Sequence, residues 1–536
     1  MGFFNKRESV GGTAADNASI ISYQSIKEYP SPPMSATRTS FARRSTSSNH
    51  SVNSKRSPSI LSNTKSFFST LSAPATAPAQ PNASVKGVKL PEPPNADEDP
   101  SGYLRTLNAV RERSNMIFEK GKTGELKCFD LDMDKMDDVV GFVASIIKRD
   151  YAPDYHLIPP HGRWQHFEVG GSKRIDRLLA AFPPSIDDFE KTRRLLDLFV
   201  VSVLLDAGAG TAWTYKEEAS HDIYRRSEGL AVASLEMFNR GRFSGDIINP
   251  WRVDAEGLSL ITADILGEDM QVSEDNPLAG LEGRTELLKN LGKALGAKPE
   301  YFGKDARPGN ILDYLLKHPT TLGAGTPNPT VLVPTLWAAL MHGFAPIWPA
   351  GRTTLPGDST QLGDAWPTQL LPQSPPHAKI VPFHKLTQWM AYSLIPPMTR
   401  LAGIRFAGMH LFTGLPEYRN GGLFVDLGLL TLKKEVEARG LATYHATVTS
   451  DKKIEVVPMY APGDEVIVEW RACTVALLDL VAEGVNKKLG LRADNALSLA
   501  QVLEAGTWKS GRELAEIQRP NTKGPPIGLL SDGTVF

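Results

Sequence analysis

The fold is decided by a stretch between residues 346 and 392, in which three segments stand out. Residues 346–352 read PIWPAGR, residues 362–367 read LGDAWP, and residues 381–392 read VPFHKLTQWMAY. Together the segments contain three tryptophans, one aspartate, one histidine, one arginine and one lysine. Aromatic planes hold flat or ring-shaped ligands, cations hold anions, and a carboxylate performs acid–base or cation-stabilising work. This mixture predicts an active site rather than plain core or plain loop.

The third segment predicts a helix with one polar face. His384, Gln388 and Tyr392 are four residues apart, and residues at this spacing share a helix face. A polar and aromatic face on an otherwise apolar helix indicates a lined cavity. Asp364 lies between a glycine and Trp366 in sequence, and a buried carboxylate without a partner is costly. We therefore expect Asp364 either to cap a helix or to work in the site.

The chain outside this stretch reads as mainly helical. Helical periodicity or apolar runs with helix stop signals cover several segments, which are 104–119, 134–149, 190–206, 227–240, 279–292, 309–317, 471–488 and 496–504. Four later segments rich in β-branched residues, 423–433, 443–449, 453–457 and 465–470, predict a small antiparallel sheet. The expected fold is a single catalytic domain of residues 96–536. It comprises a helical body (96–420) followed by the small sheet and closing helices (421–536).

The first 95 residues differ in composition from the rest. Residues 1–90 contain 19 serines and carry 11 Lys/Arg against 3 Asp/Glu, although the whole chain has a net charge of −1. Such a segment cannot bury enough apolar surface to order itself, so residues 1–95 are expected to be a disordered basic tail. Its serines beside arginines suit a kinase, and an unregulated tail explains them equally well. The acidic balance of the remaining residues argues against nucleic-acid binding.

Several classes of protein are excluded by what the sequence lacks. The two cysteines form no CxxC pair, and no apolar run approaches the roughly 20 residues of a membrane helix. These features predict a cytoplasmic protein without a membrane partner, and they leave the oligomeric state open. No GxxxxGK[ST] loop or complete dinucleotide fingerprint is present. His156, His161 and His166 lack the spacing of a zinc site, so we expect no metal and no cofactor, and place His161 and His166 as hydrogen-bonded or ligand-facing groups.

A second dense patch lies between residues 206 and 229. Trp213 and Tyr215 are expected to form a stacking wall for a ligand, with Arg226 binding an anion. The alternative interpretation is a helix–loop–helix corner in which Asp206 caps a helix.

Six motifs in order carry a resemblance to a known family. They are IPPHGRW (158–164), RSEG (226–229), VSEDNPLAGLEGR (272–284), IWPAGR (347–352), LGDAW (362–366) and VPFHKL (381–386). With these motifs the chain resembles, over roughly residues 100–536, the fungal and bacterial uracil-catabolism family long labelled domain of unknown function 1688. The resemblance implies a pyrimidine-degrading route in which uracil, as its nucleotide, is opened and urea is released.

A second resemblance concerns chemistry. The order of LGDAW, a following helix, a small sheet and VEWRA (468–472) is similar to that in queuosine-salvage nucleotide N-glycosylases. That resemblance implies a helical body like that of helix-hairpin-helix DNA glycosylases, with a catalytic aspartate in an Ala-Asp-Leu-Trp motif. Asp364 falls on that aspartate, whereas Gly363 and Ala365 depart from the motif.

The sequence thus predicts an N-glycosidase that cleaves the N-ribosyl bond of a ring-opened uracil nucleotide and releases urea. Asp364 would stabilise the oxocarbenium-like transition state, and His384 would protonate the leaving nitrogen. The expected substrate-binding residues are the ring-facing Trp213, Tyr215 and Trp366, the cations Arg226, Arg352 and Lys385, and the polar Gln388 and Tyr392. Two alternatives stay open, a ligand-binding or scaffold protein of the same pathway and a metal-free amidohydrolase that opens the ring.

Overall fold

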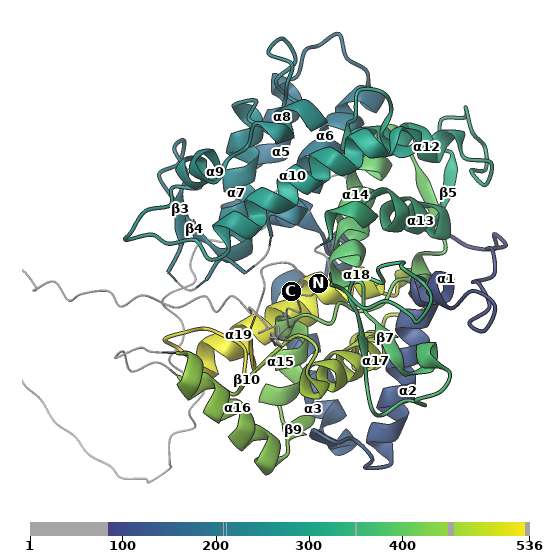
Figure 1. Cartoon of the computed structure of the whole chain (residues 1–536), viewed down its shortest axis with the longest axis vertical. Helices are drawn as coiled ribbons and strands as arrows, with labels where there is room; N and C mark the ends of the chain where they lie inside the picture. Colours follow the sequence, from purple (N-terminus) through teal and green to yellow (C-terminus); the bar gives the residue numbers. More distant parts are fainter. Residues whose placement is uncertain (1–83, 207, 211, 349–350, 449–454, 531–536) are drawn as a thin grey trace, which may run out of the picture.

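The computed structural model describes residues 84–206, 208–210, 212–348, 351–448 and 455–530. Within these ranges the chain folds mainly into helices, with strands of two or three residues, so the expected fold class is confirmed (Figure 1). The predicted disordered tail lies outside the described residues as far as residue 83. Its last part is described, and there Ser84–Val85 forms a strand, β1, that pairs with β8 (Arg405–Ala407).

Helices from the middle of the chain form the upper half of the molecule in Figure 1. They are α5 (Arg174–Ala181), α6 (Asp188–Leu204), α7 (Arg226–Asn239), α8 (Ala255–Ser259), α9 (Ala263–Asp269), α10 (Leu281–Ala297), α12 (Ile311–Lys317) and α13 (Val333–Gly343). Two short helices belong to the same part of the chain, α4 (Arg163–Phe167) beside α7 and α11 (Pro299–Phe302) beside α10.

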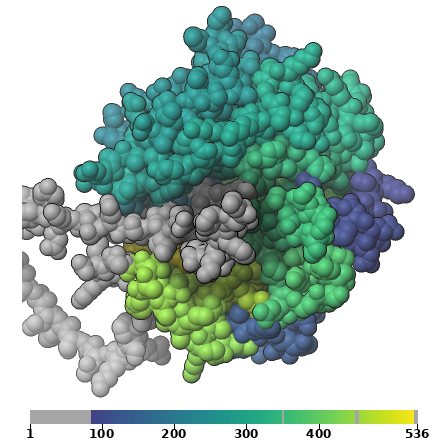
Figure 2. Space-filling view, viewed as in Figure 1, coloured from purple at the N-terminus to yellow at the C-terminus, as the bar shows by residue number. Residues whose placement is uncertain are grey.

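Helices from both ends of the described chain form the lower half. The early ones are α1 (Pro100–Leu104), α2 (Leu107–Lys122) and α3 (Met136–Tyr151), and the late ones are α15 (Tyr418–Asp426), α16 (Lys434–Thr447), α17 (Glu465–Leu489), α18 (Leu499–Val502) and α19 (Trp508–Gln518). A π-turn over Leu503–Thr507 joins α18 to α19. α17 packs on both α2 and α3. Figure 2 shows the same division on the surface, with the teal half above and the green and yellow half below.

The strands form small sheets that tie distant segments together. β8 lies between β1 and β5 (Thr330–Leu332), and both pairings are parallel. The antiparallel pairs are β2 (Phe129–Leu131) with β9 (Leu430–Leu432), β3 (Thr214–Lys216) with β4 (Ile223–Arg225), and β6 (Ala365–Pro367) with β7 (Ile380–Pro382). β10 (Met459–Tyr460) pairs in parallel with β11 (Gly528–Leu529). Three of the predicted strands are wrong. Residues 443–447 and 465–470 lie in α16 and α17, and residues 455–457, the described part of the predicted strand 453–457, form no strand.

Two long helices form the centre of the molecule, α6 and α14 (Lys385–Ala402), which pack against each other. Asp187 caps the start of α6, because its side chain accepts from the Glu190 N–H, and the residues of α6 from Leu195 to Leu204 are all buried. α14 begins after His384, which has a φ of +46°, and stops at Gly403 in the left-handed conformation. Asp206, two residues after the end of α6, and Lys385, the first residue of α14, both line the cavity described below.

Candidate functional site

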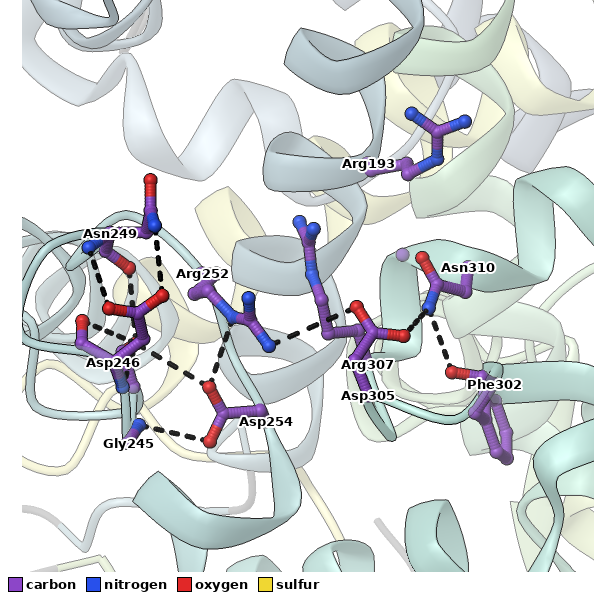
Figure 3. Close-up of polar contacts among 12 residues, drawn as sticks. Arg193, Gly245, Asp246, Asn249, Arg252, Asp254, Phe302, Asp305, Arg307 and Asn310 are labelled. Carbon is purple, nitrogen blue, oxygen red and sulfur yellow. Dashed lines mark hydrogen bonds and ion pairs between the residues drawn. The ribbon is translucent and has the colours of Figure 1, made fainter.

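One hollow among the described residues has a volume of about 570 Å³ and a charged lining. Arg193 binds the Asp313 carboxylate through two bonds of 2.8 Å, and Arg307 binds Asp197 at 2.8 Å. Next to it, Arg252 bridges Asp254 and Asp305, and Asp305 also accepts a bond from Asn310 (Figure 3). Because its arginines are already held by carboxylates, this hollow offers a ligand few free charges.

A second cavity, of about 250 Å³, lies where the upper and lower helices meet. Its lining comes from segments far apart in sequence, among them His161, His166, Asp206, Arg226, Lys385, Trp389, Glu417, Tyr418, Trp470, Trp508 and Ile527. The lining therefore combines three tryptophans with two histidines, two carboxylates and two cations. An apolar pocket with a few convergent polar groups is the usual form of a small-molecule site.

The aromatic wall of the cavity is built around Trp389. The ring centroid of Trp389 lies 4.6 Å from that of His161 and 5.5 Å from that of His166. Trp508 also lies near the two histidines, with centroid distances of 6.3 Å to His161 and 5.8 Å to His166. The indole N–H of Trp389 is buried without a hydrogen-bond partner among the described residues. A ligand acceptor would satisfy that donor.

The two histidines have different polar partners. His161 is 2% exposed, and its Nδ1 lies 2.6 Å from Oε2 of Glu504, which belongs to the π-turn before α19. That contact orients the ring and leaves Nε2 for a ligand. Nδ1 of His166 faces Arg163 at 3.2 Å, and burial, reinforced by the Arg163 charge, lowers the pKa of His166. His166 is therefore neutral at pH 7.

The two carboxylates in the lining differ in how fully they are bonded. Both oxygens of Glu417 accept backbone N–H groups at the start of α15, from Arg419 at 2.9 Å and Asn420 at 2.6 Å, and burial raises its pKa. Asp206 pairs through Oδ2 with Arg163 at 2.9 Å, and its side chain is 8% exposed. Its Oδ1 is buried without a partner in the described part of the chain. Asp206 is thus the lining carboxylate with one oxygen that makes no hydrogen bond to a described residue.

Lys385, the first residue of α14, brings a cation into the same cavity. Its backbone N–H donates to Oδ2 of Asp364 at 3.0 Å, while its ammonium group makes no hydrogen bond or ion pair with any described residue. Burial lowers the pKa of Lys385, and Arg471 acts in the same direction, whereas Glu417 and Asp206 act in the opposite one. Lys385 is half-buried, and its ammonium group loses a proton more readily than that of an exposed lysine because the net effect is a lowered pKa.

The structure places Asp364 outside this cavity. Arg471 binds its two oxygens at 2.7 Å each, and the Trp366 indole N–H donates to Oδ1 at 2.8 Å. Burial would raise the pKa of Asp364, but the charge and hydrogen bonds of Arg471, with smaller help from Trp366 and Lys385, hold it at about 2. The adjacent void of about 10 Å³ holds at most one water. Asp364 is a fully bonded anchor that fixes Lys385, not a carboxylate facing a ligand.

The predicted polar face of α14 also points away from the cavity. Nε2 of His384 lies 2.8 Å from the Leu104 carbonyl oxygen, and burial lowers the pKa of His384 to about 4. Gln388 donates to Thr413 Oγ1 at 2.9 Å, and the Tyr392 hydroxyl donates to the Thr413 carbonyl at 3.1 Å. These three side chains hold neighbouring segments in place, which corrects the expectation that they line a cavity.

The remaining predicted residues are divided between core, surface and cavity. Trp213 and Tyr215 are buried, and Trp213 donates to the Met270 carbonyl at 2.9 Å, so they form core and not a ligand wall. The Arg352 guanidinium lies 5.8 Å from the Trp366 ring and does not line the cavity, nor does Trp366. Arg226 does line it, and donates to the carbonyls of Thr522 at 2.8 Å and Lys523 at 3.1 Å. Of the predicted site, the cavity therefore contains Arg226 and Lys385.

The described part of the chain contains no cluster of three or more His, Cys, Asp or Glu placed to hold a metal ion. None of the helices in the same ranges is long and apolar enough to cross a membrane.

Comparison with known proteins gives a family and two relatives. Residues 103–536 match the family model described as "Protein of unknown function (DUF1688)". The chain is 46% identical over 451 residues to "Uracil catabolism protein 4" of Lachancea kluyveri, covering 82% of this chain and 99% of the relative. It is 43% identical over 434 residues to "Protein urg3" of Schizosaccharomyces pombe, covering 81% of this chain and 98% of the relative. The matched region includes every residue of the cavity lining.

Proposed function

Because this chain belongs to the DUF1688 family, with a relative named for uracil catabolism, we propose that it is an enzyme of uracil catabolism. The proposed reaction is hydrolysis of the bond between ribose and a ureido nitrogen in a ring-opened uracil nucleotide, which releases urea and ribose phosphate. The single observation that carries the proposal is a carboxylate, Asp206, that lines a cavity with three tryptophans and has one oxygen without a hydrogen-bond partner among the described residues.

The chemistry of this bond suits the cavity. Departure of a ureido nitrogen leaves positive charge on the sugar, and a nearby carboxylate stabilises that charge most strongly where water is excluded. Asp206 supplies the carboxylate, and Arg163 holds it in place through the other oxygen. The ureido nitrogen needs a proton as it leaves, and His161, oriented by Glu504, is the donor in this proposal.

The walls of the cavity suit the rest of the substrate. Trp389 and Trp508 offer flat apolar faces to the sugar and the ureido group. Arg226 binds the 5′-phosphate, since its guanidinium has donors in addition to those directed at Thr522 and Lys523. Asp364 has a positioning role, because it binds the Lys385 backbone N–H and the Arg471 side chain, which in turn donates to the Pro416 carbonyl next to Glu417.

The test is an assay of urea from purified protein and ribosylurea 5′-phosphate. Wild-type protein should release urea, and Asp206→Asn should release it slower by on the order of 10² or more. Asp264→Asn is the matched control, because Asp264 is an exposed aspartate on α9, and should keep the wild-type rate. A folded wild-type protein that releases no urea would refute the proposed reaction, and binding without turnover would instead favour a ligand-binding protein of the pathway.

A further inference from the structure

Lys385 lines the cavity, but it has no role in the proposed hydrolysis if an activated water attacks the sugar. Its side chain lines the cavity, yet its ammonium nitrogen has no hydrogen-bond or ion-pair partner among the described residues. The described structure has several buried polar atoms that have neither a hydrogen-bond partner nor contact with solvent, and the Lys385 nitrogen is not one of them. The nitrogen therefore faces the open space of the cavity, where it can reach a bound ligand.

The backbone of Lys385 is fixed more firmly than that of a surface lysine. Its N–H donates to Asp364, whose carboxylate is held by Arg471 in a two-bond ion pair. The residue opens a long helix, and Trp389 lies one turn further on, on the same face. The lysine stem thus starts from a rigid point beside the aromatic wall.

The charges around Lys385 suit an amine that changes its protonation state. Asp206 and Glu417 are the lining carboxylates whose charges act on it, and Asp206 has an oxygen free to take a proton. Burial and Arg471 favour the neutral amine. In enzymes, a desolvated lysine amine can act as a nucleophile that attacks a carbon at the oxidation level of an aldehyde.

We infer that the Lys385 amine attacks the sugar carbon C1′ and displaces the ureido nitrogen, so that the reaction passes through a covalent enzyme–sugar intermediate. This inference rests on the proposed function, and adds a nucleophile and a covalent step to it.

The step balances in atoms and electrons. The lone pair of the neutral amine forms the bond to C1′, the C1′–N bond breaks, and its electron pair leaves with the ureido nitrogen, which takes a proton from His161. Asp206 accepts the proton lost by the attacking amine. The C1′–O4′ bond then opens as Asp206 returns this proton to O4′, which gives a protonated imine. One water adds to the protonated imine and releases ribose phosphate with the free amine, and the proton set free returns to His161. The net reaction consumes one water and no oxidant or reductant.

The test is reductive trapping. Wild-type protein is incubated with ribosylurea 5′-phosphate and sodium cyanoborohydride, and intact mass and peptide mapping follow. The expected result is one reduced sugar-phosphate adduct per chain, located on Lys385. Adduct on other lysines in place of Lys385, or no adduct while urea is still released, overturns the inference and leaves the proposed hydrolase intact. Absence of urea release from folded wild type overturns both.

Two variants separate a nucleophile from a simple positive charge. Lys385→Arg keeps a cation but cannot form an imine, and should lose trapping together with at least roughly 10³ in rate. The lysine side chain has no bonded partner among the described residues, so this variant should keep the wild-type thermal midpoint. An Arg variant that retains a rate within about tenfold of wild type contradicts the covalent step, since charge alone then suffices.

Chemical rescue provides the positive control. In Lys385→Cys, alkylation with bromoethylamine rebuilds an amine at the lysine position. Cys128 and Cys473 are both buried, so the reagent should modify the new thiol selectively. Alkylation should restore both urea release and trapping at residue 385. Restoration of neither, in a protein that mass spectrometry shows to be alkylated there, counts against the nucleophile.

Discussion

Replacing Asp364 by asparagine should destabilise the protein more than it alters its chemistry. The Asp364 carboxylate accepts two bonds of 2.7 Å from Arg471, one of 2.8 Å from Trp366 and one of 3.0 Å from the Lys385 backbone. Arg471 is 1% exposed, so Asp364→Asn removes the carboxylate that pairs with a buried charge. Removing one partner of such a buried pair costs about 3–5 kcal/mol. We expect the thermal midpoint to fall by roughly 5–10 °C.

The pH dependence has a definite sign. The pKa of Asp364 in the folded protein is about 2, below the value of 3.8 for an exposed aspartate. A carboxyl group whose pKa is lower in the folded protein stabilises the folded state at pH values above its pKa in the unfolded chain. This contribution is lost as the pH falls from about 4 to 2. The shift corresponds to about 2 kcal/mol, which Asp364→Asn should lack. The stability difference between wild type and variant should therefore shrink below pH 4.

Unfolding followed by circular dichroism and tryptophan fluorescence measures both effects. A double-mutant cycle with Arg471→Met should show that the two changes are not additive, because the second removes the stranded charge. Glu286→Gln, which breaks an exposed pair with Lys289, is the control and should leave the midpoint unchanged. If Asp364→Asn keeps the wild-type midpoint but loses on the order of 10² in rate, Asp364 acts in the chemistry and the assignment of the site to Asp206 is refuted.

Three further predictions concern the cavity lining. His161→Asn should lower kcat by on the order of 10² to 10⁴. Glu504→Gln should lower kcat less and should change its pH profile. A pH profile that is unchanged in both variants contradicts a proton donor at this position. Trp389→Phe keeps an aromatic face but removes the unpartnered indole N–H, so KM should rise by roughly tenfold at little change in kcat, and an unchanged KM shows that the donor meets no ligand. Arg226→Gln should raise KM for the 5′-phosphorylated substrate and leave that for the unphosphorylated riboside unchanged; equal effects on both count against a phosphate contact.

Much of the fold was predictable because its helices are long and repeat apolar residues with a helical period. The errors lie where β-branched residues are buried within helices. Val466, Ile467 and Val468 favour a strand by local preference, but they are fully buried in α17. Asp464, which accepts from the Val466 N–H, was a helix start signal in the sequence. Packing on α2 and α3 determines the outcome there, and it is not visible in local sequence.

The site was harder to predict, because its residues meet through packing. The prediction chose the face of α14 that carries His384 and Gln388, whereas the cavity uses Lys385 and Trp389, one residue further along. A shift of one residue rotates a helix face by about 100°, and the rotation is set by contact with α6, not by composition. Trp508 joins them from a segment more than a hundred residues later, beyond any motif spacing. Arg226 and Lys385 were predicted to line the site because each is a cation close in sequence to several aromatic residues, and this signal does not depend on tertiary packing.

The central claim is that catalysis occurs in the tryptophan-lined cavity, at Asp206. The most direct measurement is a crystal structure of the Asp206→Asn protein soaked with ribosylurea 5′-phosphate. We expect the sugar against Trp389, its C1′ within reach of residue 206 and Lys385, and the phosphate at Arg226. Ligand density in the hollow lined by Arg193 and Arg307, or beside Asp364 with the tryptophan-lined cavity vacant, would contradict this assignment.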